Sequence, residues 1–330
     1  MGSSRLNVRQ WFAIFGHYYN FQQPYQSLDG RAPAQEVTYT VPLTYVSQTI
    51  YMTISDDYQI DMINMGDFTF DDYGRLLDAA LAHGYTFYTL QEYVTRSNHD
   101  SPHIIVRHDV DRKVSTARSM ARVEADRNIS TSYYFRTSTF SPETAAEVSG
   151  LGHEIGYHYE DLAKTRGDFE AAHERFGRNL TAFRKHADVR TICPHGSPLS
   201  PHHNLDMWRG KYSIEDYDLD GEAYLSVDTN NDDAERPSYV SDTGRDWGTT
   251  IADFGRISTT DDLIAGLGSD GCERLYLLVH PGRWSRNPIE HVQRVAWDLA
   301  AEAGKSTARS VHAIGQVTND RIIRVFRERT

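Results

Sequence analysis

Two aspartates that close an apolar strand constrain this chain more than any other feature. The apolar run 104–106 is followed by Arg107-His108-Asp109-Val110-Asp111-Arg112. Side chains two residues apart in a strand point to the same side, so Asp109 and Asp111 converge at the strand's end. Adjacent carboxylates repel each other, and a divalent cation or a shared proton removes that repulsion. An Asp at such a turn can also be a simple helix cap, but His-Asp-x-Asp favours a functional site.

The composition limits the class of protein. The chain has 330 residues and a formal net charge of -12, which argues against a general nucleic-acid binder, so we expect no nucleic-acid partner. Its two cysteines, Cys193 and Cys272, are too few for a disulfide framework. No apolar run approaches the roughly 20 residues of a membrane span, and we find no signal peptide. We therefore expect a soluble protein with no membrane span and a cytoplasmic location.

Helical and strand patterns alternate along most of the chain. The predicted helices cover about 69–81, 113–127, 142–151, 168–187 and 288–303, with a further helix starting at Thr259, and the predicted strands cover 103–106, 131–136, 154–160, 189–193, 223–227, 239–241 and 274–279. This alternation predicts an α/β protein with a parallel sheet or barrel. Active residues of such folds lie beyond the carboxyl ends of the strands, where Asp109, Asp111, His158 and His195 fall.

Residues 1–61 differ from the rest of the chain. The stretch 11–37 resembles the tail of insertion-sequence transposases of the integrase type, although Tyr25 stands where that pattern has His. No acidic triad of those enzymes can be placed around it, so a role in transposition lacks the residues it would need. We predict that 1–61 is an N-terminal extension outside the catalytic domain, and that 62–330 forms one domain. A native N-terminal arm is the alternative.

Three motifs in the remaining chain resemble those of one enzyme family. They are His108-Asp109-Val110-Asp111, Gly152-His153-Glu154-Ile155-Gly156-Tyr157-His158 and Leu277-Leu278-Val279-His280. Their order and spacing resemble the polysaccharide deacetylase family, also called the chitooligosaccharide-deacetylase homology domain, over about residues 66–300. The first motif is a divergent form of the family's Thr-Phe-Asp-Asp-Gly. The resemblance implies a distorted (β/α) barrel of the polysaccharide deacetylase type.

The resemblance also implies roles for individual residues. Asp109 corresponds to the catalytic base, Asp111 and His158 to metal ligands, and His280 to the catalytic acid. The family's second metal histidine would fall at position 162, where this chain has Leu162. Amide hydrolysis needs a base, an acid and a stabilised oxyanion, and a bound metal supplies the last while activating water. With mixed nitrogen and oxygen ligands we expect a divalent metal, Zn²⁺.

Two residues are candidates for the third metal ligand. His195 ends the strand after that of His158, and Glu160 shares the strand face of His158. We favour His195 and keep Glu160 as the alternative. Cys193 next to His195 would suit a Cys–His nucleophile, but a Cys near a strand end is more often an inert apolar residue. We expect His153 to be structural.

Further candidates lie late in the chain. Asp242, Arg245 and Trp247 loosely resemble the family's motif that places Asp and Trp near the base and the acid. Arg245 is predicted to pair with Asp109 and to tune its pKa, with a structural Asp–Arg pair as the alternative. Aromatic faces stack on sugar rings, so Arg283 and Trp284 are predicted, with Asp242 and Trp247, to bind substrate; for Trp284 a core position is the alternative.

The sequence therefore predicts a metal-dependent hydrolase that removes an acetyl group from an N-acetylated sugar of a glycan or glycan precursor. The alternative is a non-catalytic carbohydrate-binding relative that kept the barrel and lost the metal. The missing histidine at Leu162 motivates that alternative, whereas retention of Asp109, Asp111 and His280 opposes it.

Overall fold

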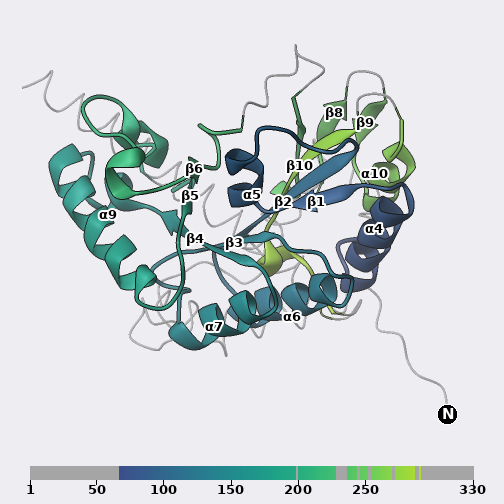
Figure 1. Ribbon diagram of the computed structural model, residues 1–330, viewed down its shortest axis with the longest axis horizontal. Helices are drawn as coiled ribbons and strands as arrows, with labels where there is room; N and C mark the ends of the chain where they lie inside the picture. The colour runs from purple at the N-terminus through teal and green to yellow at the C-terminus, as the bar shows by residue number, and fades with distance from the viewer. Residues whose placement is uncertain are drawn as a thin grey trace, which may run out of the picture. The chain divides into compact units, whose positions relative to one another are not determined.

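A fully buried strand, β2 (His103–Val110), lies at the centre of the structure (Figure 1). The computed structural model describes residues 67–197, 200–227, 236–243, 246–251, 254–269, 272–286 and 290. All of them fall within one unit, Met65–Arg294. The predicted extension 1–61 lies outside the described residues, as do Arg245 and all of the predicted helix 288–303 except Glu290.

The strands form one parallel sheet around β2. β2 pairs with β10 (Arg274–Val279) on one side, and with β3 (Ser132–Phe135) and β1 (Thr86–Tyr88) on the other. The full order is β6 (Gly221–Glu222), β5 (Thr191–Pro194), β4 (Glu154–Tyr159), β3, β2, β10, β7 (Ser238–Ser241). Each neighbouring pair is parallel. The sheet curves into a half-barrel, which confirms the predicted α/β class and distorted (β/α) barrel.

Helices cover the outer face of this sheet. They are α4 (Phe70–Ala82), α6 (Val114–Ala125), α7 (Pro142–Gly150), α8 (Asp161–Lys164), α9 (Phe169–Arg184) and α10 (Thr260–Gly266), with 3₁₀ turns η2 (Asn204–Trp208), η3 (Glu215–Tyr217) and η5 (Pro281–Arg283). The short helix α5 (Leu90–Thr95) lies on the inner side instead, where Leu90 packs with Ile105 of β2. Thr69 and Thr259 begin their helices with capping boxes, which satisfy the free amides of a first turn. None of the described helices is long and apolar enough to span a membrane.

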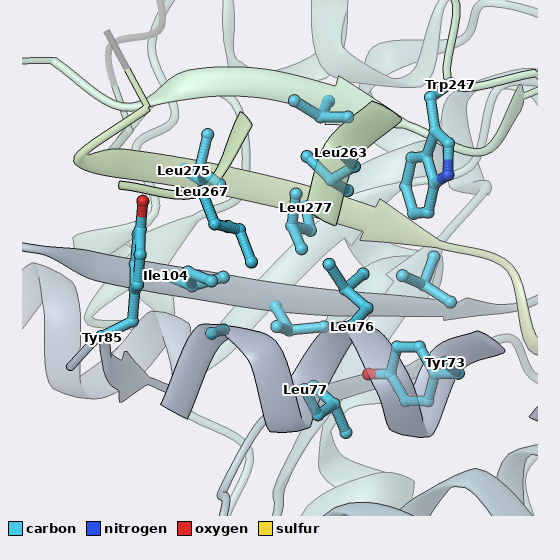
Figure 2. Close-up of a cluster of buried hydrophobic side chains, with 14 of the residues drawn as sticks. Tyr73, Leu76, Leu77, Tyr85, Ile104, Trp247, Leu263, Leu267, Leu275 and Leu277 are labelled. Carbon is cyan, nitrogen blue, oxygen red and sulfur yellow. The ribbon is translucent and has the colours of Figure 1, made fainter. Parts of the chain in front are cut away.

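Alternation along the strands separates two cores. Ile104 and Val106 of β2 pack in an outer cluster with Leu76 of α4 and Leu277 of β10 (Figure 2). Ile105, from the opposite face, lies in an inner cluster under the half-barrel. Each fully buried apolar side chain of this size contributes about 1.5–3 kcal/mol to folding. Because both faces of β2 are packed, its register and the direction of its polar side chains are fixed.

The structure departs from the predicted elements in two places. The strand predicted over 223–227 is wrong: β6 ends at Glu222, whose carboxylate accepts hydrogen bonds from the amides of Tyr224 and Leu225. This local capping holds the chain in a turn instead of a sheet ladder. The antiparallel hairpin β8 (Thr249–Ile251) and β9 (Gly255–Ile257) was not predicted, because strands of three residues carry too little periodicity.

The first and last described segments of the unit are joined directly. Thr69 and Ser285 form a parallel β-bridge. The amide of Phe70 donates to the carbonyl of Ser285 (2.9 Å), and the amide of Ser285 donates to the carbonyl of Phe68 (3.0 Å). This bridge ties the start of α4 to the segment that follows β10.

Candidate functional site

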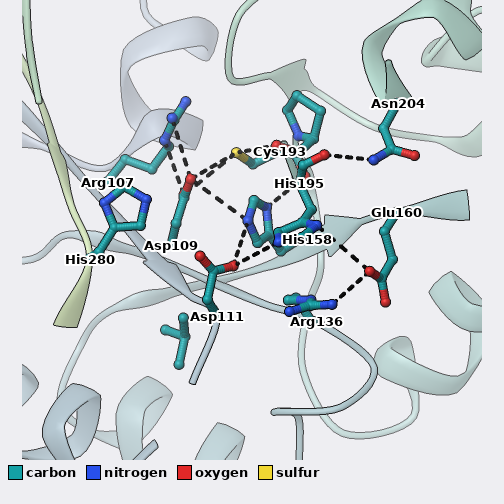
Figure 3. Close-up of polar contacts among 12 residues, drawn as sticks. Arg107, Asp109, Asp111, Arg136, His158, Glu160, Cys193, His195, Asn204 and His280 are labelled. Atoms are coloured by element: carbon teal, nitrogen blue, oxygen red, sulfur yellow. Dashed lines mark hydrogen bonds and ion pairs between the residues drawn. The ribbon is translucent and has the colours of Figure 1, made fainter. Parts of the chain in front are cut away.

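Polar side chains from β2, β4 and β5 meet at the carboxyl edge of the half-barrel (Figure 3). Asp111 Oδ1 lies 3.3 Å from His158 Nε2 and 3.4 Å from His195 Nε2. Asp109 Oδ2 lies 3.8 Å from the same His158 nitrogen. The structure thus brings together four of the predicted site residues from three different strand ends.

Arg107 holds the Asp109 carboxylate. Its Nε lies 3.2 Å from Asp109 Oδ1, and its Nη2 lies 3.5 Å from Oδ2. The guanidinium is fully buried and also donates to the hydroxyls of Tyr276 (3.1 Å) and Tyr224 (2.8 Å). Arg107 is therefore a partner of Asp109, whereas the predicted partner Arg245 lies outside the described residues. The signal was present, since Arg107 precedes Asp109 by two residues and shares its strand face.

His158 presents one nitrogen to both carboxylates. Its Nδ1 lies 3.0 Å from the carbonyl of Cys193 and donates to it, so the lone pair is on Nε2, which faces Asp109 and Asp111. Burial lowers the pKa of His158, but Asp109 and Asp111 outweigh it and the pKa is raised overall. Burial likewise opposes ionisation of Asp111, yet His158 and His195 hold its pKa below the usual range. The negative charges of Asp109 and Asp111, which favour a proton on His158, would also favour a cation bound at the same place.

His195 approaches Asp111, whereas Glu160 turns to other partners. Burial, together with the charge on His158, lowers the pKa of His195 to about 4, so its ring stays neutral and can offer a lone pair. Glu160 Oε2 pairs with Arg136 at 2.7 Å and lies 3.7 Å from His195 Nδ1. Of the two candidates for a third ligand, His195 is the one whose nitrogen faces Asp111.

The spacing of the two histidine nitrogens from Asp111 suits a divalent metal. Zinc–nitrogen and zinc–oxygen bonds are about 2.0–2.2 Å long, which puts neighbouring ligand atoms of a tetrahedron about 3.3–3.5 Å apart. The 3.3 and 3.4 Å separations around Asp111 Oδ1 match that spacing. The same oxygen is buried and makes no hydrogen bond of regular geometry. Buried polar atoms of folded proteins are nearly always hydrogen-bonded. A buried Asp111 Oδ1 without a regular hydrogen bond is therefore suited to bind a metal ion.

Cys193 lies below this group, against Asp109. Its Sγ is 3.6 Å from Asp109 Oδ1 and 3.8 Å from Oδ2, and the side chain is fully buried. Burial raises the pKa of the thiol well above its ordinary value. A protonated, enclosed thiol is a poor nucleophile, in line with the role expected for Cys193.

His280 faces the group from β10, held by Asp242. His280 Nδ1 lies 2.6 Å from Asp242 Oδ1, and the His280 amide donates to Oδ2 at 2.8 Å. Trp284 Nε1 donates to Oδ2 at 2.9 Å, and Arg283 Nη1 donates to the Asp242 carbonyl at 2.7 Å. Burial would raise the pKa of Asp242, but His280 and Arg283 lower it overall. Asp242 thus orients His280, a role different from the substrate contact predicted for it.

The two tryptophans predicted to contact sugar are core residues. Trp247 is 1% exposed, and its Nε1 donates to Thr260 Oγ1 at 3.1 Å. Trp284 is 0% exposed. Neither ring presents a face to solvent, so the prediction of substrate stacking is wrong for both. The exposed aromatic beside the site is Tyr224, at 42%, whose hydroxyl contacts Arg107. This exposure was not predicted, because Tyr224 falls in the stretch 223–227, whose pattern resembles a strand.

A second polar cluster lies outside β2 and was also missed. Glu124 Oε1 accepts hydrogen bonds from Tyr73 and His108, and Oε2 accepts from Tyr133 and Thr131. Burial would raise the pKa of Glu124, but the neighbouring histidines and Tyr73 lower it to about 2. His153, expected to be structural, contacts the Ala121 carbonyl through Nε2 at 2.9 Å and lies outside the metal group.

Comparisons with known proteins give matches of fold only. No protein-family model and no curated protein matches the sequence. A pseudoenzyme of carbohydrate esterase family 4 from Bacillus anthracis matches with 12% identity and a TM-score of 0.36, over 63% of this chain and 63% of its own. A family 4 esterase from Streptococcus mutans matches with 13% identity and a TM-score of 0.39, over 68% and 91%. A peptidoglycan deacetylase from Bacillus subtilis matches with 14% identity and a TM-score of 0.36, over 60% and 85%.

The matched structures are of the kind that the three sequence motifs resemble. The aligned part spans less than two thirds of the length of the Bacillus anthracis pseudoenzyme. Identities this low say nothing about activity, so the function has to be argued from the residues of this chain.

Proposed function

We propose that this chain is a metal-dependent hydrolase that removes an acetyl group from an N-acetylated sugar. The proposal rests on one observation. Two side chains, each held by a charged partner, flank a group of residues that could bind a metal. Asp109 is held by Arg107 on one side, and His280 is held by Asp242 on the other. Between them lie Asp111, His158 and His195.

Each residue then has a definite task. A divalent cation, Zn²⁺ by preference, held by Asp111, His158 and His195 would polarise the acetyl carbonyl and lower the pKa of a water. Asp109 is the general base that takes the proton from the attacking water, and Arg107 holds its carboxylate in place. His280 donates Nδ1–H to Asp242 and so directs Nε2 into the site, where it protonates the leaving nitrogen. The buried Asp242 carboxylate stabilises the imidazolium form that this step requires.

The substrate follows from the same chemistry. Protonation of a leaving nitrogen is needed for an amide and not for an activated ester. We propose a nucleotide-linked or lipid-linked glycan precursor as the substrate, on the expectation of a cytoplasmic location. The alternative function, non-catalytic carbohydrate binding, is motivated by Leu162. This residue is buried in a hydrophobic cluster with Tyr157 and Phe176 and cannot serve as a ligand.

The test compares acetate release from an N-acetylated oligosaccharide with hydrolysis of an aryl acetate. Asp109→Asn should lower kcat on both substrates by about 10²–10⁴, the usual contribution of a general base. His280→Ala should lower the rate on the acetamide far more than on the aryl ester, whose leaving group needs no proton. Equal losses on both substrates would contradict the acid role of His280. Metal-loaded wild-type protein that binds the oligosaccharide without releasing acetate would favour the binding protein.

A further inference from the structure

A second set of donor atoms lies deeper in the half-barrel than the one used above. One atom each of Asp109, His158 and Cys193 lies within 4.8 Å of the other two, and all three residues are buried. Asp109 Oδ2 lies 3.8 Å from Cys193 Sγ and 3.8 Å from His158 Nε2. Figure 3 shows the three side chains converging from β2, β4 and β5.

The geometry of this set is close to that of a tetrahedral metal site. With zinc–sulfur bonds of about 2.3 Å and zinc–nitrogen or zinc–oxygen bonds of about 2.0–2.2 Å, neighbouring ligand atoms lie about 3.3–3.6 Å apart. Both 3.8 Å separations from Asp109 Oδ2 are a few tenths of an ångström above those values. A sulfur, an imidazole nitrogen and a carboxylate oxygen select Zn²⁺, Co²⁺ or Cd²⁺ over Mg²⁺ and Mn²⁺.

The charges around the set also suit a dication. When the S–metal bond forms, the Cys193 proton leaves to solvent and the sulfur becomes a thiolate. The thiolate and Asp109 then carry two negative charges against the single positive charge of Arg107.

We propose that Asp109, His158 and Cys193 form a second metal position, selective for thiophilic cations, that excludes metal from the position on Asp111, His158 and His195. The exclusion follows because both positions use the single lone pair of His158 Nε2. A cation in the deeper position also takes the Asp109 carboxylate as a ligand, so the general base is lost. The softer the cation, the more it favours this inactive position. The inhibitory consequence rests on the proposed function, whereas the binding position itself does not.

Cobalt spectroscopy tests the binding position directly. Chelator-treated full-length protein is titrated with Co²⁺, and the near-ultraviolet thiolate-to-cobalt charge-transfer band is recorded. The matched control is Cys272→Ser, in which Cys193 is the single remaining thiol, since the chain has two cysteines. We expect the band in wild type and in Cys272→Ser, and its loss in Cys193→Ser. Cobalt-loaded wild type without the band, or a band that persists in Cys193→Ser, overturns the proposal.

The same titration separates this proposal from the proposed function. Bound cobalt with visible ligand-field bands but no thiolate band removes the deeper position and leaves the position on Asp111. Protein that binds no cobalt removes both.

Inhibition by Cd²⁺ tests the consequence. Relative to each variant's own uninhibited rate, the Cd²⁺ concentration that halves activity should rise by more than about tenfold in Cys193→Ser, since even an outer-sphere partner contributes that much to metal affinity. It should not move in Cys272→Ser. An unchanged value in Cys193→Ser would show that Cd²⁺ inhibits elsewhere and would overturn the inhibitory role.

Discussion

Glu124 and Asp111 are two carboxylates near opposite faces of β2, and they differ in the hydrogen-bond partners that the protein supplies. Glu124, outside the strand, accepts from Tyr73, His108, Tyr133 and Thr131, with three of these contacts at 2.6–3.0 Å. Asp111, at the inner edge, faces two histidine nitrogens at 3.3 and 3.4 Å, and its Oδ1 has no regular hydrogen bond. The chain supplies every partner of Glu124, whereas Asp111 faces two histidine nitrogens of a kind that can bind a metal. The first carboxylate therefore stabilises the fold, and the second is arranged for a cation.

The strongest test of this difference is Asp111→Asn. We expect complete loss of Mn²⁺ binding, because the variant removes the charge shared by His158 and His195 and the deeper position with Cys193 disfavours Mn²⁺. The melting temperature of the metal-free protein should stay close to that of wild type, since Oδ1 makes no regular hydrogen bond to lose. Metal analysis and thermal unfolding measure the two effects. Stoichiometric Mn²⁺ in the variant would show that Asp111 is not a ligand of this metal position.

Glu124→Gln should show the reverse behaviour. It removes a buried charge from partners that stay buried, so the free energy of unfolding should fall by about 3–5 kcal/mol. Urea unfolding of metal-free protein measures this loss. Metal affinity of the folded variant should remain that of wild type; a loss of affinity comparable to that of Asp111→Asn would show that the two carboxylates are not independent.

Acid unfolding should report the Glu124 cluster. The pKa of Glu124 in the folded protein is lowered to about 2 from 4.5, so its stabilising contribution is present above about pH 4.5 and is lost as the pH falls towards 2. Metal-free wild type should lose stability across this window. Glu124→Gln should lose less stability there, because the neutral amide does not titrate. Parallel curves for the two proteins would contradict the assignment.

The smallest effect is expected from Glu160→Gln. Glu160 contacts His195 Nδ1 at 3.7 Å and pairs mainly with Arg136, so it supports a ligand without being one. Metal affinity should fall by about tenfold, the lower range for an outer-sphere partner. Isothermal titration calorimetry with Mn²⁺ measures this. A complete loss, as in Asp111→Asn, would make Glu160 the third ligand in place of His195.

Strand periodicity explains why much of the site was predictable. Asp109, Asp111 and His158 follow apolar strands, and the carboxyl ends of parallel strands meet at one edge whatever the details of packing. His195 followed from the same rule one strand further along. These predictions needed only the strand order and the direction of alternate side chains.

Contacts between segments far apart in the sequence could not be predicted from strand periodicity. The contact between Asp242 and His280 joins residues 38 positions apart, and it depends on β7 pairing directly with β10, a neighbour relation that the order of the strands along the chain does not reveal. Trp247 and Trp284 were predicted to meet sugar, but an aromatic residue near a motif carries no sign of whether its face is covered. Arg107 was not predicted as the partner of Asp109, although it lies two residues away on the same strand face.

The β-bridge between Thr69 and Ser285 has a consequence for the architecture as a whole. It places Thr69 next to Ser285, so that the described path from α4 to the segment after β10 closes on itself like a ring. A unit whose two ends meet can be inserted into another protein at a single loop, or opened elsewhere and rejoined at the bridge as a circular permutant.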